Sequence, residues 1–393
     1  MVALANYKYQ DIIHRCFRCG YCKFPADWSD VTNCPAYGRF RLESFSSGGR
    51  LWLIRAWVNG EIQWSPHLAK IVYACVACNN CVEKCPLPFH DDIVHMINAA
   101  KSEMVELGLL PKEVKTYLHN VQQHGNPYGL PAKRRSAWME SLNLEPFQGQ
   151  EYLYYVGCEG SYDTRAQLAA RAVAAQLKAA GVAFGVLGNA ETADGNDVEM
   201  LGEEGLAELV ATRNIATFHQ HGVRKIVVLS PHSFNAMKHM YPRFGGNFEV
   251  YHYTQILPRL LGGKKIQGAL SGTSRVTYHD PCLLGRWNRE YNAPRKLLAA
   301  IDGVELVEMP RNKKSALCCG GGAGNYLTDF LGGSAESPAR MRIREAHATG
   351  AAVLAVACPN CLTMLEDAVK VEGLEGQLAV RDIAELMGPA EGA

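Results

Sequence analysis

The sequence has almost no net charge and no long apolar segment. Its 40 basic residues balance 39 acidic ones over 393 positions, which gives a formal charge of +1. The net charge of the chain therefore does not favour binding to nucleic acid or to an anionic membrane. The longest apolar stretch, residues 350–357 (GAAVLAVA), is far shorter than the roughly 20 residues of a membrane-spanning helix. We expect no nucleic-acid partner and no membrane span.

The N-terminus also lacks the apolar segment of a signal peptide. The opening MVALANYKYQDIIHR places polar and charged residues where that segment would be. We therefore predict a cytoplasmic protein, in which disulfide bonds are rare. The length suits two or three domains, and 48% hydrophobic with 20% charged residues excludes disordered, collagen-like and coiled-coil proteins.

Cysteine is missing from residues 86–157 but abundant on both sides. Of the 14 cysteines, eight precede residue 86 and six follow residue 157. The segment between them carries turn formers at 122–130 and a linker-like stretch at 142–150, which place a domain boundary near residue 148. Clusters of CxxC in a long chain without a signal peptide indicate metal or iron–sulfur ligation rather than disulfides.

Beyond residue 148, short apolar runs alternate with amphipathic stretches. We predict strands at 152–156, 183–187 and 225–229, with helices at 165–180 and 198–221. The same order returns from residue 275: Cys158 and Cys282 each end a strand 282 − 158 = 124 positions apart, and Gly222 and Gly350 precede strands 350 − 222 = 128 apart. The pattern predicts two copies of one α/β unit with mostly parallel sheets, divided near residue 270.

Two cysteine triplets with Cys-Pro partners occupy the N-terminal part. CVACNNCVEKCP is the C-x2-C-x2-C-x3-C-P run of bacterial ferredoxins, CFRCGYC repeats its triplet, and Cys34-Pro35 supplies a displaced fourth cysteine. In such runs the fourth cysteine ligates the other cluster. We therefore assign one 4Fe-4S cluster to Cys16, Cys19, Cys22 and Cys85, and a second to Cys75, Cys78, Cys81 and Cys34. A pair of structural zinc sites is the alternative.

Five more cysteines follow predicted strands of the second copy: Cys282, Cys318, Cys319, Cys358 and Cys361. Strand ends of parallel sheets meet in one crevice, so we expect these thiols to converge. Five exceed the four that a cubane takes, so one is spare or the cluster is not a cubane. Gly320 and Gly321 let the backbone approach a cofactor and offer N–H groups to its sulfurs.

Two alternatives compete for this second group of cysteines. A dinucleotide-binding loop would need GxGxxG, which the glycines after Cys319 do not match. A catalytic Cys282 thiolate with His279 and Asp280 would leave the other four cysteines unexplained.

The first copy lacks most of these cysteines. Ala193 and Asp194 stand where the second copy has Cys318 and Cys319, and Ser230 and Ser233 replace Cys358 and Cys361. Only Cys158 remains. A vestigial scaffold is the simpler interpretation, and a zinc site made of Cys158, Asp194 and His232 is the alternative.

These motifs, together with HDPCLLGR, CCGGGAGN and CPNCLTMLED, resemble the CCG-domain family of heterodisulfide reductase, in the fused form of its D-type subunit. The resemblance implies a multi-domain α+β chain. A helical ferredoxin domain with two 4Fe-4S clusters (1–148) precedes two duplicated Rossmann-like α/β domains of CCG type (149–270 and 271–393). It also implies one noncubane 4Fe-4S cluster on Cys282, Cys318, Cys319, Cys358 and Cys361, with Gly320 and Gly321 beside it.

The resemblance further implies partners in a large hetero-oligomeric complex. These are a flavoprotein of the heterodisulfide reductase A type, where FAD would be bound, and a catalytic unit. Within the family, CFRCGYCKFPAD and ACNNCVEKC look most like the electron-transfer subunit of class II benzoyl-CoA reductase (BamD type). That likeness implies catalytic subunits of the BamB and BamC type and a role in anaerobic metabolism.

The missing cysteines of the first copy favour electron relay over disulfide chemistry. True heterodisulfide reductases of the family cleave a disulfide between two noncubane clusters, and this sequence provides for one. We expect an oxidoreductase subunit that relays electrons and is not catalytic alone, and we assign no catalytic residue. A thiol–disulfide reductase subunit stays open. So does a link between a flavoprotein dehydrogenase and quinone, which the lack of a fused membrane segment makes the weaker alternative.

Overall fold

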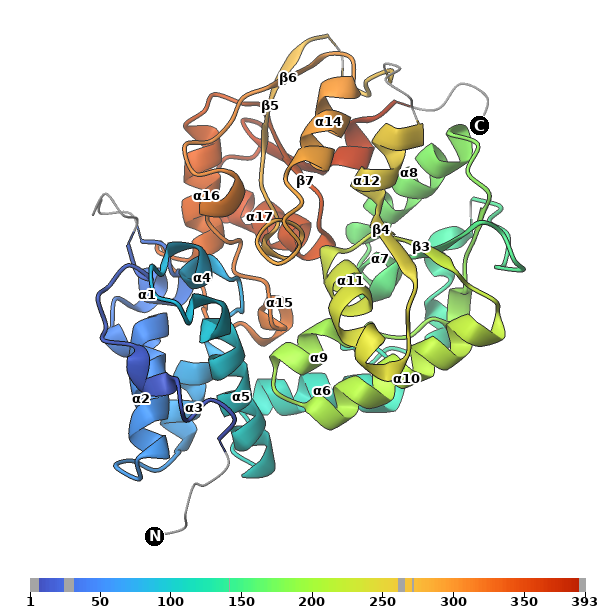
Figure 1. The fold of residues 1–393 in the computed structure, drawn as a ribbon. Helices are drawn as coiled ribbons and strands as arrows, with labels where there is room; N and C mark the ends of the chain where they lie inside the picture. Colours follow the sequence, from blue (N-terminus) through green and yellow to red (C-terminus); the bar gives the residue numbers. More distant parts are fainter. Residues whose placement is uncertain (1–6, 25–31, 141, 261–265, 271, 389–393) are drawn as a thin grey trace.

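The computed structural model describes residues 7–24, 32–140, 142–260, 266–270 and 272–388. Figure 1 shows a helical N-terminal part in blue, a first α/β unit in green and yellow, and a second in orange and red. The division expected at residues 270 and 271 stays a prediction, and Ser271 lies outside the described residues.

The described residues of the N-terminal part form six α-helices. They are α1 (Pro35–Phe40), α2 (Ser47–Val58), α3 (Pro66–Tyr73), α4 (Asn80–Lys84), α5 (Ile93–Glu106) and α6 (Lys112–His124). Local signals set their ends: Ser46 Oγ accepts the Gly49 N–H at the start of α2, and Gly125 ends α6 with a left-handed φ of 66°. Helix α5 packs one apolar face on α2 and α3.

The first α/β unit contains a parallel sheet in the order β2-β1-β3-β4. Its strands are β1 (Tyr152–Tyr155), β2 (Phe184–Gly185), β3 (Lys225–Val228) and β4 (Glu249–His252). Its helices are α7 (Gly157–Tyr162), α8 (Ala166–Ala179), α9 (Asn196–Met200), α10 (Glu204–Gln220), α11 (Pro231–Asn235) and α12 (Tyr253–Leu260). In the register, Tyr152 pairs with Phe184 on one side and Lys225 on the other.

The second unit repeats this topology in the order β6-β5-β7-β8, also parallel. Its strands are β5 (Ser274–Tyr278), β6 (Val304–Leu306), β7 (Val353–Val356) and β8 (Ala379–Asp382). Its helices are α13 (Cys282–Gly285), α14 (Asn292–Ala300), α15 (Asn325–Thr328), α16 (Pro338–His347) and α17 (Pro359–Val371). The predicted pair of parallel α/β units is confirmed.

One predicted helix is wrong. The stretch expected to be helical from 198 to 221 is divided into α9 and α10, with a break around Gly202. Gly202 has φ +89°, and an added Cβ would lie 2.6 Å from backbone atoms of Lys101 and Ser102 on α5. Only glycine permits this close approach, so the break marks a contact between the helical part and the first α/β unit.

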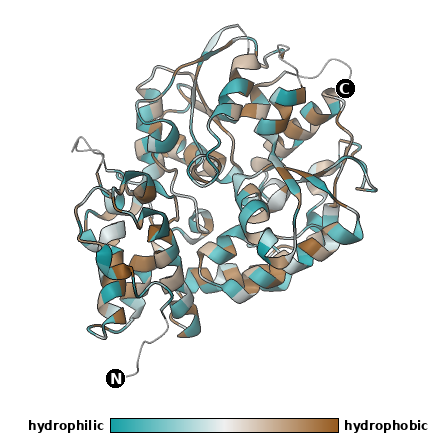
Figure 2. Ribbon diagram, viewed as in Figure 1, coloured by the Kyte–Doolittle hydropathy of each residue, from teal (hydrophilic) through white to brown (hydrophobic). Residues whose placement is uncertain are grey.

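Two buried apolar clusters hold the three parts together. One extends from Ile54 and Met104 in the helical part to Phe218 in α10, and the other joins the two sheets, with Val227 and Leu354 among its members. Figure 2 shows helices that carry both hydrophobic and hydrophilic residues, as expected when each buries one face. No helix in the described segments is both long and apolar enough to cross a membrane.

Candidate metal centres

The first cavity is lined by the four cysteines that are predicted to bind one 4Fe-4S cluster. It lies between the loop after residue 15, the start of α2 and the end of α4, and its lining includes Cys16, Cys19, Cys22 and Cys85. Gly48 is close to two of these sulfurs: a Cβ there would lie 3.6 Å from Cys22 Sγ and 3.8 Å from Cys16 Sγ. The N-terminal end of the twelve-residue helix α2 therefore faces the sulfurs, where its backbone N–H groups favour negative charge.

The second cavity is lined by the four cysteines that are predicted to bind the other 4Fe-4S cluster. Its lining includes Cys34, Cys75, Cys78 and Cys81, and Ser47 of α2 lines both cavities. Each cavity therefore receives three cysteines from one triplet and the fourth from the other. This is the arrangement that the crossed assignment requires, although the ligation itself stays a prediction.

The two triplets share an unusual backbone conformation. In each, the residue before and the residue after the central cysteine has positive φ: Arg18 (56°) and Gly20 (93°), and Ala77 (49°) and Asn79 (59°). Such angles are costly for residues with a side chain and occur mainly where function requires them. The turns direct three sulfurs toward one centre. Nothing in the local sequence signals this conformation for Ala77.

Burial makes five of the eight thiols in the two cavities weaker acids. Burial raises the pKa of Cys22 to about 12 and also raises the pKa of Cys16, Cys34, Cys81 and Cys85. All of them are free cysteines. A buried thiolate is stable only beside a cation or a metal, so a soft metal centre fits both donor sets.

Buried cations surround the second cavity. Arg50 is 1% exposed and lines the cavity, and its Nη2 has no hydrogen-bond partner among the described residues. Lys101 Nζ donates to the carbonyl of Cys75 at 3.1 Å, and Arg286 Nε donates to the carbonyl of Cys78 at 2.6 Å. At the first cavity, by contrast, Arg18 is exposed and lies over the ring of Trp52.

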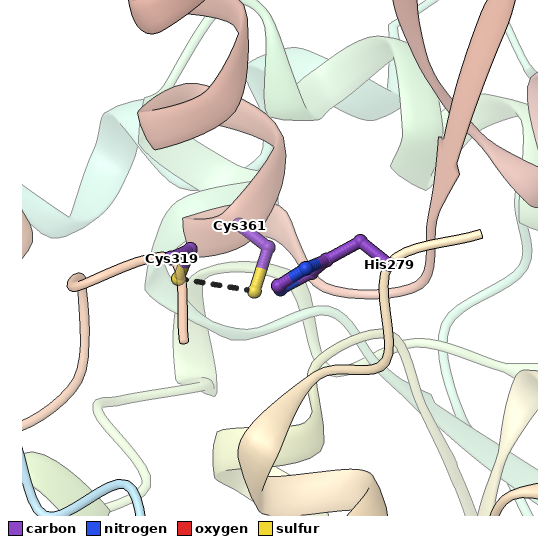
Figure 3. A group of neighbouring side chains, drawn as sticks. All are labelled: His279, Cys319 and Cys361. Atoms are coloured by element: carbon purple, nitrogen blue, oxygen red, sulfur yellow. Dashed lines mark hydrogen bonds between the residues drawn. The ribbon is translucent and has the colours of Figure 1, made fainter. Parts of the chain in front are cut away.

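The third group brings together all five cysteines of the second α/β unit. Cys319 Sγ and Cys361 Sγ are 3.3 Å apart, as the dashed line in Figure 3 shows. Further hydrogen bonds join Cys318 to Cys282 and to Cys319, and Cys358 to Cys361. The backbone N–H groups of Gly320 and Gly321 donate to Cys318 Sγ at 3.3 Å and to Cys319 Sγ at 3.5 Å. Five buried sulfurs thus form one group at the carboxyl ends of the strands.

The second and third sites touch each other. A hydrogen bond between the thiols of Cys78 and Cys318 lowers the pKa of Cys78 to about 6, and Arg286 contributes to this lowering. Gly322 makes the approach possible, because a Cβ at this position would lie 2.5 Å from the carbonyl oxygen of Val76. Trp287 Nε1 also donates to the carbonyl of Ala77 at 2.8 Å.

His279 belongs to the third site, although no sequence motif indicated a metal role for it. Its ring and the sulfurs of Cys319 and Cys361 place their donor atoms within 4.8 Å of one another, and all three residues are buried (Figure 3). Burial lowers the pKa of His279. Asp280 binds Arg295 instead, at 2.7 and 3.0 Å, so the alternative of a catalytic Cys282 with both His279 and Asp280 is not supported.

In the first unit, other side chains occupy the place of the lost cysteines. Cys158 Sγ accepts a hydrogen bond from Arg135 Nη2 at 3.3 Å, and Arg135 also pairs with Glu191. Asp194 accepts from Ser233 at 2.7 Å, and His232 lies 3.0 Å from Asp197. In the described part of the chain, the ligand atoms of His279, Cys319 and Cys361 lie within 4.8 Å of one another, whereas those of Cys158, Asp194 and His232 do not. The zinc alternative for Cys158, Asp194 and His232 is therefore not supported.

Thiol-lined sites on a helical domain and two parallel α/β units define an iron–sulfur protein. Residues 12–88 match the 4Fe-4S dicluster domain, and residues 152–238 and 276–366 each match the cysteine-rich CCG domain. The chain belongs to the family of CCG-domain iron–sulfur proteins that includes the D-type subunit of heterodisulfide reductase.

Curated relatives with quite different names share this organisation. The chain is 30% identical over 410 residues to the D-type subunit of the dihydromethanophenazine:CoB–CoM heterodisulfide reductase of Methanosarcina barkeri, covering 96% of this chain and 93% of the relative. It is 35% identical to the probable iron-sulfur-binding oxidoreductase FadF of Bacillus subtilis, covering 80% and 46%. It is 33% identical to EtfAB:quinone oxidoreductase of Syntrophomonas wolfei, covering 82% and 47%. The chain spans about half the length of the latter two.

Proposed function

We propose that this chain is an iron–sulfur electron-transfer subunit that relays single electrons between a flavoprotein partner and a catalytic partner. The observation that carries the proposal is the contact between the second and third sites, where Arg286 donates to the carbonyl of Cys78, Trp287 donates to the carbonyl of Ala77, and Gly322 lies against the carbonyl of Val76. Iron–sulfur clusters, when bound, supply centres that accept and release one electron at a time.

The residues have distinct tasks in this proposal. Cys16, Cys19, Cys22 and Cys85 hold one 4Fe-4S cluster, Cys75, Cys78, Cys81 and Cys34 hold a second, and Cys282, Cys318, Cys319, Cys358 and Cys361 hold a noncubane 4Fe-4S cluster. Gly320 and Gly321 donate N–H groups to the sulfurs of the last site. Arg286 donates to the carbonyls of Cys78 and Ala316 and so ties the loops of two sites together.

The first α/β unit supports relay rather than disulfide cleavage. Arg135 bonds Cys158 and pairs with Glu191, so the cysteine that this unit retains is engaged by a guanidinium group. With Ala193, Asp194, Ser230 and Ser233 at the other four positions, this unit does not offer the five thiols of a second noncubane cluster, which disfavours cleavage of a disulfide between two such clusters.

The first site is the better exposed end of the relay. Cys19, Cys22 and Cys85 are half-buried, whereas the cysteines of the third site are buried. Phe17, within the first triplet, is 64% exposed, and Arg15 and Arg18 beside it are exposed as well. We propose that the flavoprotein, which would carry FAD, docks at this end.

Two kinds of catalytic partner fit an electron-relay subunit of this kind. The CFRCGYCKFPAD and ACNNCVEKC motifs favour a class II benzoyl-CoA reductase with catalytic subunits of the BamB and BamC type. A second candidate is an electron link between an electron-transfer flavoprotein and quinone. It is favoured by the similarity to the EtfAB:quinone oxidoreductase of Syntrophomonas wolfei.

Iron analysis of the anaerobically purified chain tests the cluster assignment. We expect about twelve irons per chain from three clusters of four. Cys319→Ala should lose about four irons and one set of electron paramagnetic resonance (EPR) signals while two cubane signals persist. Cys158→Ala is the matched control from the first unit and should lose none. Eight irons with zinc in the wild type would contradict the assignment.

The partners are tested by anaerobic affinity purification from the native cell. Recovery of a flavoprotein together with aromatic acyl-CoA reductase subunits supports the first candidate. Recovery of an electron-transfer flavoprotein, with quinone reduction by the complex, supports the second. Reoxidation of the isolated reduced chain by a disulfide would contradict both.

A further inference from the structure

We propose that His279 donates a hydrogen bond from Nε2 to the sulfur of Cys319 and thereby raises the reduction potential of the cluster at the third site. This inference rests on the proposed function, because it concerns the cluster that the five cysteines would hold. It adds a sixth side chain to the environment of that cluster, one that is not a cysteine.

Arg342 determines which nitrogen of His279 carries the proton. Arg342 is buried, and its Nε donates to His279 Nδ1 at 3.1 Å. A guanidinium group has only donors, so Nδ1 must be the acceptor and the neutral ring carries its hydrogen on Nε2. Arg342 is itself held by Glu345 at 2.8 Å and by the carbonyl of Arg311 at 2.8 Å.

The sulfurs of Cys319 and Cys361 are the acceptors that lie beside the ring of His279. Nε2 is buried and has no hydrogen-bond partner among the described residues. The ring lies beside Cys319 and Cys361 and points toward their sulfurs in Figure 3. Leaving a buried N–H unpaired is costly, so donation to a sulfur is favoured.

The first α/β unit provides an internal comparison. The offsets of the repeat place Tyr155 at the position of His279 (279 − 155 = 124) and Asn214 at that of Arg342 (342 − 214 = 128). Tyr155 donates to the carbonyl of Thr192, and Asn214 donates to the carbonyl of Ala193. In the unit that lacks four of the five cysteines, these two positions therefore bond to neighbouring groups of that unit and not to a sulfur.

A hydrogen bond to a ligand sulfur changes the potential in a defined direction. Reduction adds negative charge to the cluster and its thiolates, and an N–H group aimed at a sulfur stabilises that charge. Arg342 places a buried positive charge behind the ring and strengthens the effect. Loss of the donor should therefore make the cluster harder to reduce.

Anaerobic redox titration followed by EPR tests the proposal in the full-length, cluster-loaded chain. His279→Phe should make the reduction equilibrium of the third cluster about tenfold less favourable. For one electron, this corresponds to a reduction potential that is about 59 mV more negative. His279→Gln retains an N–H donor and should recover part of the shift. Tyr155→Phe is the matched control and should leave the potential of the third cluster unchanged. An unchanged potential in His279→Phe, with the iron content intact, would overturn the proposal.

A measurement on the wild type does not depend on the folding of any variant. Pulsed EPR of chain labelled with 15N-histidine and exchanged into D2O should detect a weak histidine nitrogen coupling and an exchangeable deuteron at the third cluster. No nitrogen coupling, or the strong coupling of a directly bound nitrogen, would overturn the proposal. Absence of the third cluster itself from the wild type would instead refute the proposed function.

Discussion

At the scale of single residues, charge distinguishes the two ferredoxin-type sites. Arg50, Lys101 and Arg286 are all buried and lie around the second cavity, whereas Arg18 at the first is exposed to water. A buried charge acts through a medium of low dielectric and is little screened by salt. An added electron should therefore be held more strongly at the second site than at the first.

Replacement of Arg50 tests this difference. Arg50→Met should lower the potential of the second cluster by roughly 59 mV or more, a tenfold change in its reduction equilibrium, because a buried cation with a free Nη2 beside the cluster is lost. The first cluster should be unaffected. Redox titration of the two cubane EPR signals makes the measurement, with Arg18→Met as control. Equal shifts of both clusters would contradict the expectation.

A second residue-scale prediction concerns pH. Burial raises the pKa of Asp382 to about 7, and its carboxylate accepts a hydrogen bond from Tyr253. Between the unfolded pKa near 4 and about 7, the folded chain keeps a proton that the unfolded chain has released. The stabilisation is therefore complete below about pH 4 and is lost as the pH rises through 7.

Asp382→Asn should remove this part of the pH dependence. The free energy of unfolding of the wild type should fall by on the order of a few kcal/mol between pH 5 and pH 8 from this group, and the variant should fall less. Anaerobic urea unfolding at both pH values measures the difference. Asp367→Asn, at an exposed position on α17, should keep the slope of the wild type. An Asp382→Asn slope equal to that of the wild type would refute the assignment.

At the scale of elements, two loops meet because one of them carries a glycine. The loop after Cys319 approaches the loop of the second triplet so closely that Gly322 lies against the carbonyl of Val76. Since the second and third sites meet through these loops, their separation determines how easily an electron crosses.

Gly322→Ala should widen this contact. We expect unchanged iron content and cubane potentials but a several-fold slower reduction of the third cluster, measured anaerobically by stopped-flow spectroscopy. Gly333→Ala is the matched control, because nothing lies within 4 Å of a Cβ at that position and its φ is not left-handed. An unchanged rate in Gly322→Ala would show that the close approach does not limit transfer.

The elements also show what the sequence could and could not reveal. Parallel strands and the convergence of five cysteines follow from periodicity and from the rule that strand ends share an edge. The break at Gly202 could not be predicted, because it depends on a contact with Lys101 about a hundred positions earlier. The pairing of His279 with Arg342 spans 63 positions (342 − 279) and has no local signal. The buried cations are likewise assembled from separate helices.

At the scale of the whole molecule, the first α/β unit is a scaffold that contacts both other parts. It packs against the helical part through Gly202 and against the second unit through ion pairs of Arg165 with Glu366 and Glu385. Arg135, from the segment before this unit, forms a buried ion pair with Glu191 beside Cys158.

Loss of Arg135 should destabilise the molecule without removing iron. Arg135→Met leaves Glu191 as an unpaired buried carboxylate, which should cost roughly 3–5 kcal/mol in the free energy of unfolding. Iron content should equal that of the wild type, in contrast to Cys319→Ala. The double variant Arg135→Met/Glu191→Gln should recover much of the loss in anaerobic urea unfolding. Loss of four irons from Arg135→Met would instead indicate that this unit binds a cluster.

The contact between Cys78 and Cys318 joins parts that a single polypeptide connects. Covalent connection gives the two sites a high effective concentration for each other, which does not change when the protein is diluted. The transfer step between them should therefore be first order at any protein concentration. Delivery from a separate donor protein, in contrast, should slow on dilution, so the two steps can be separated by concentration alone.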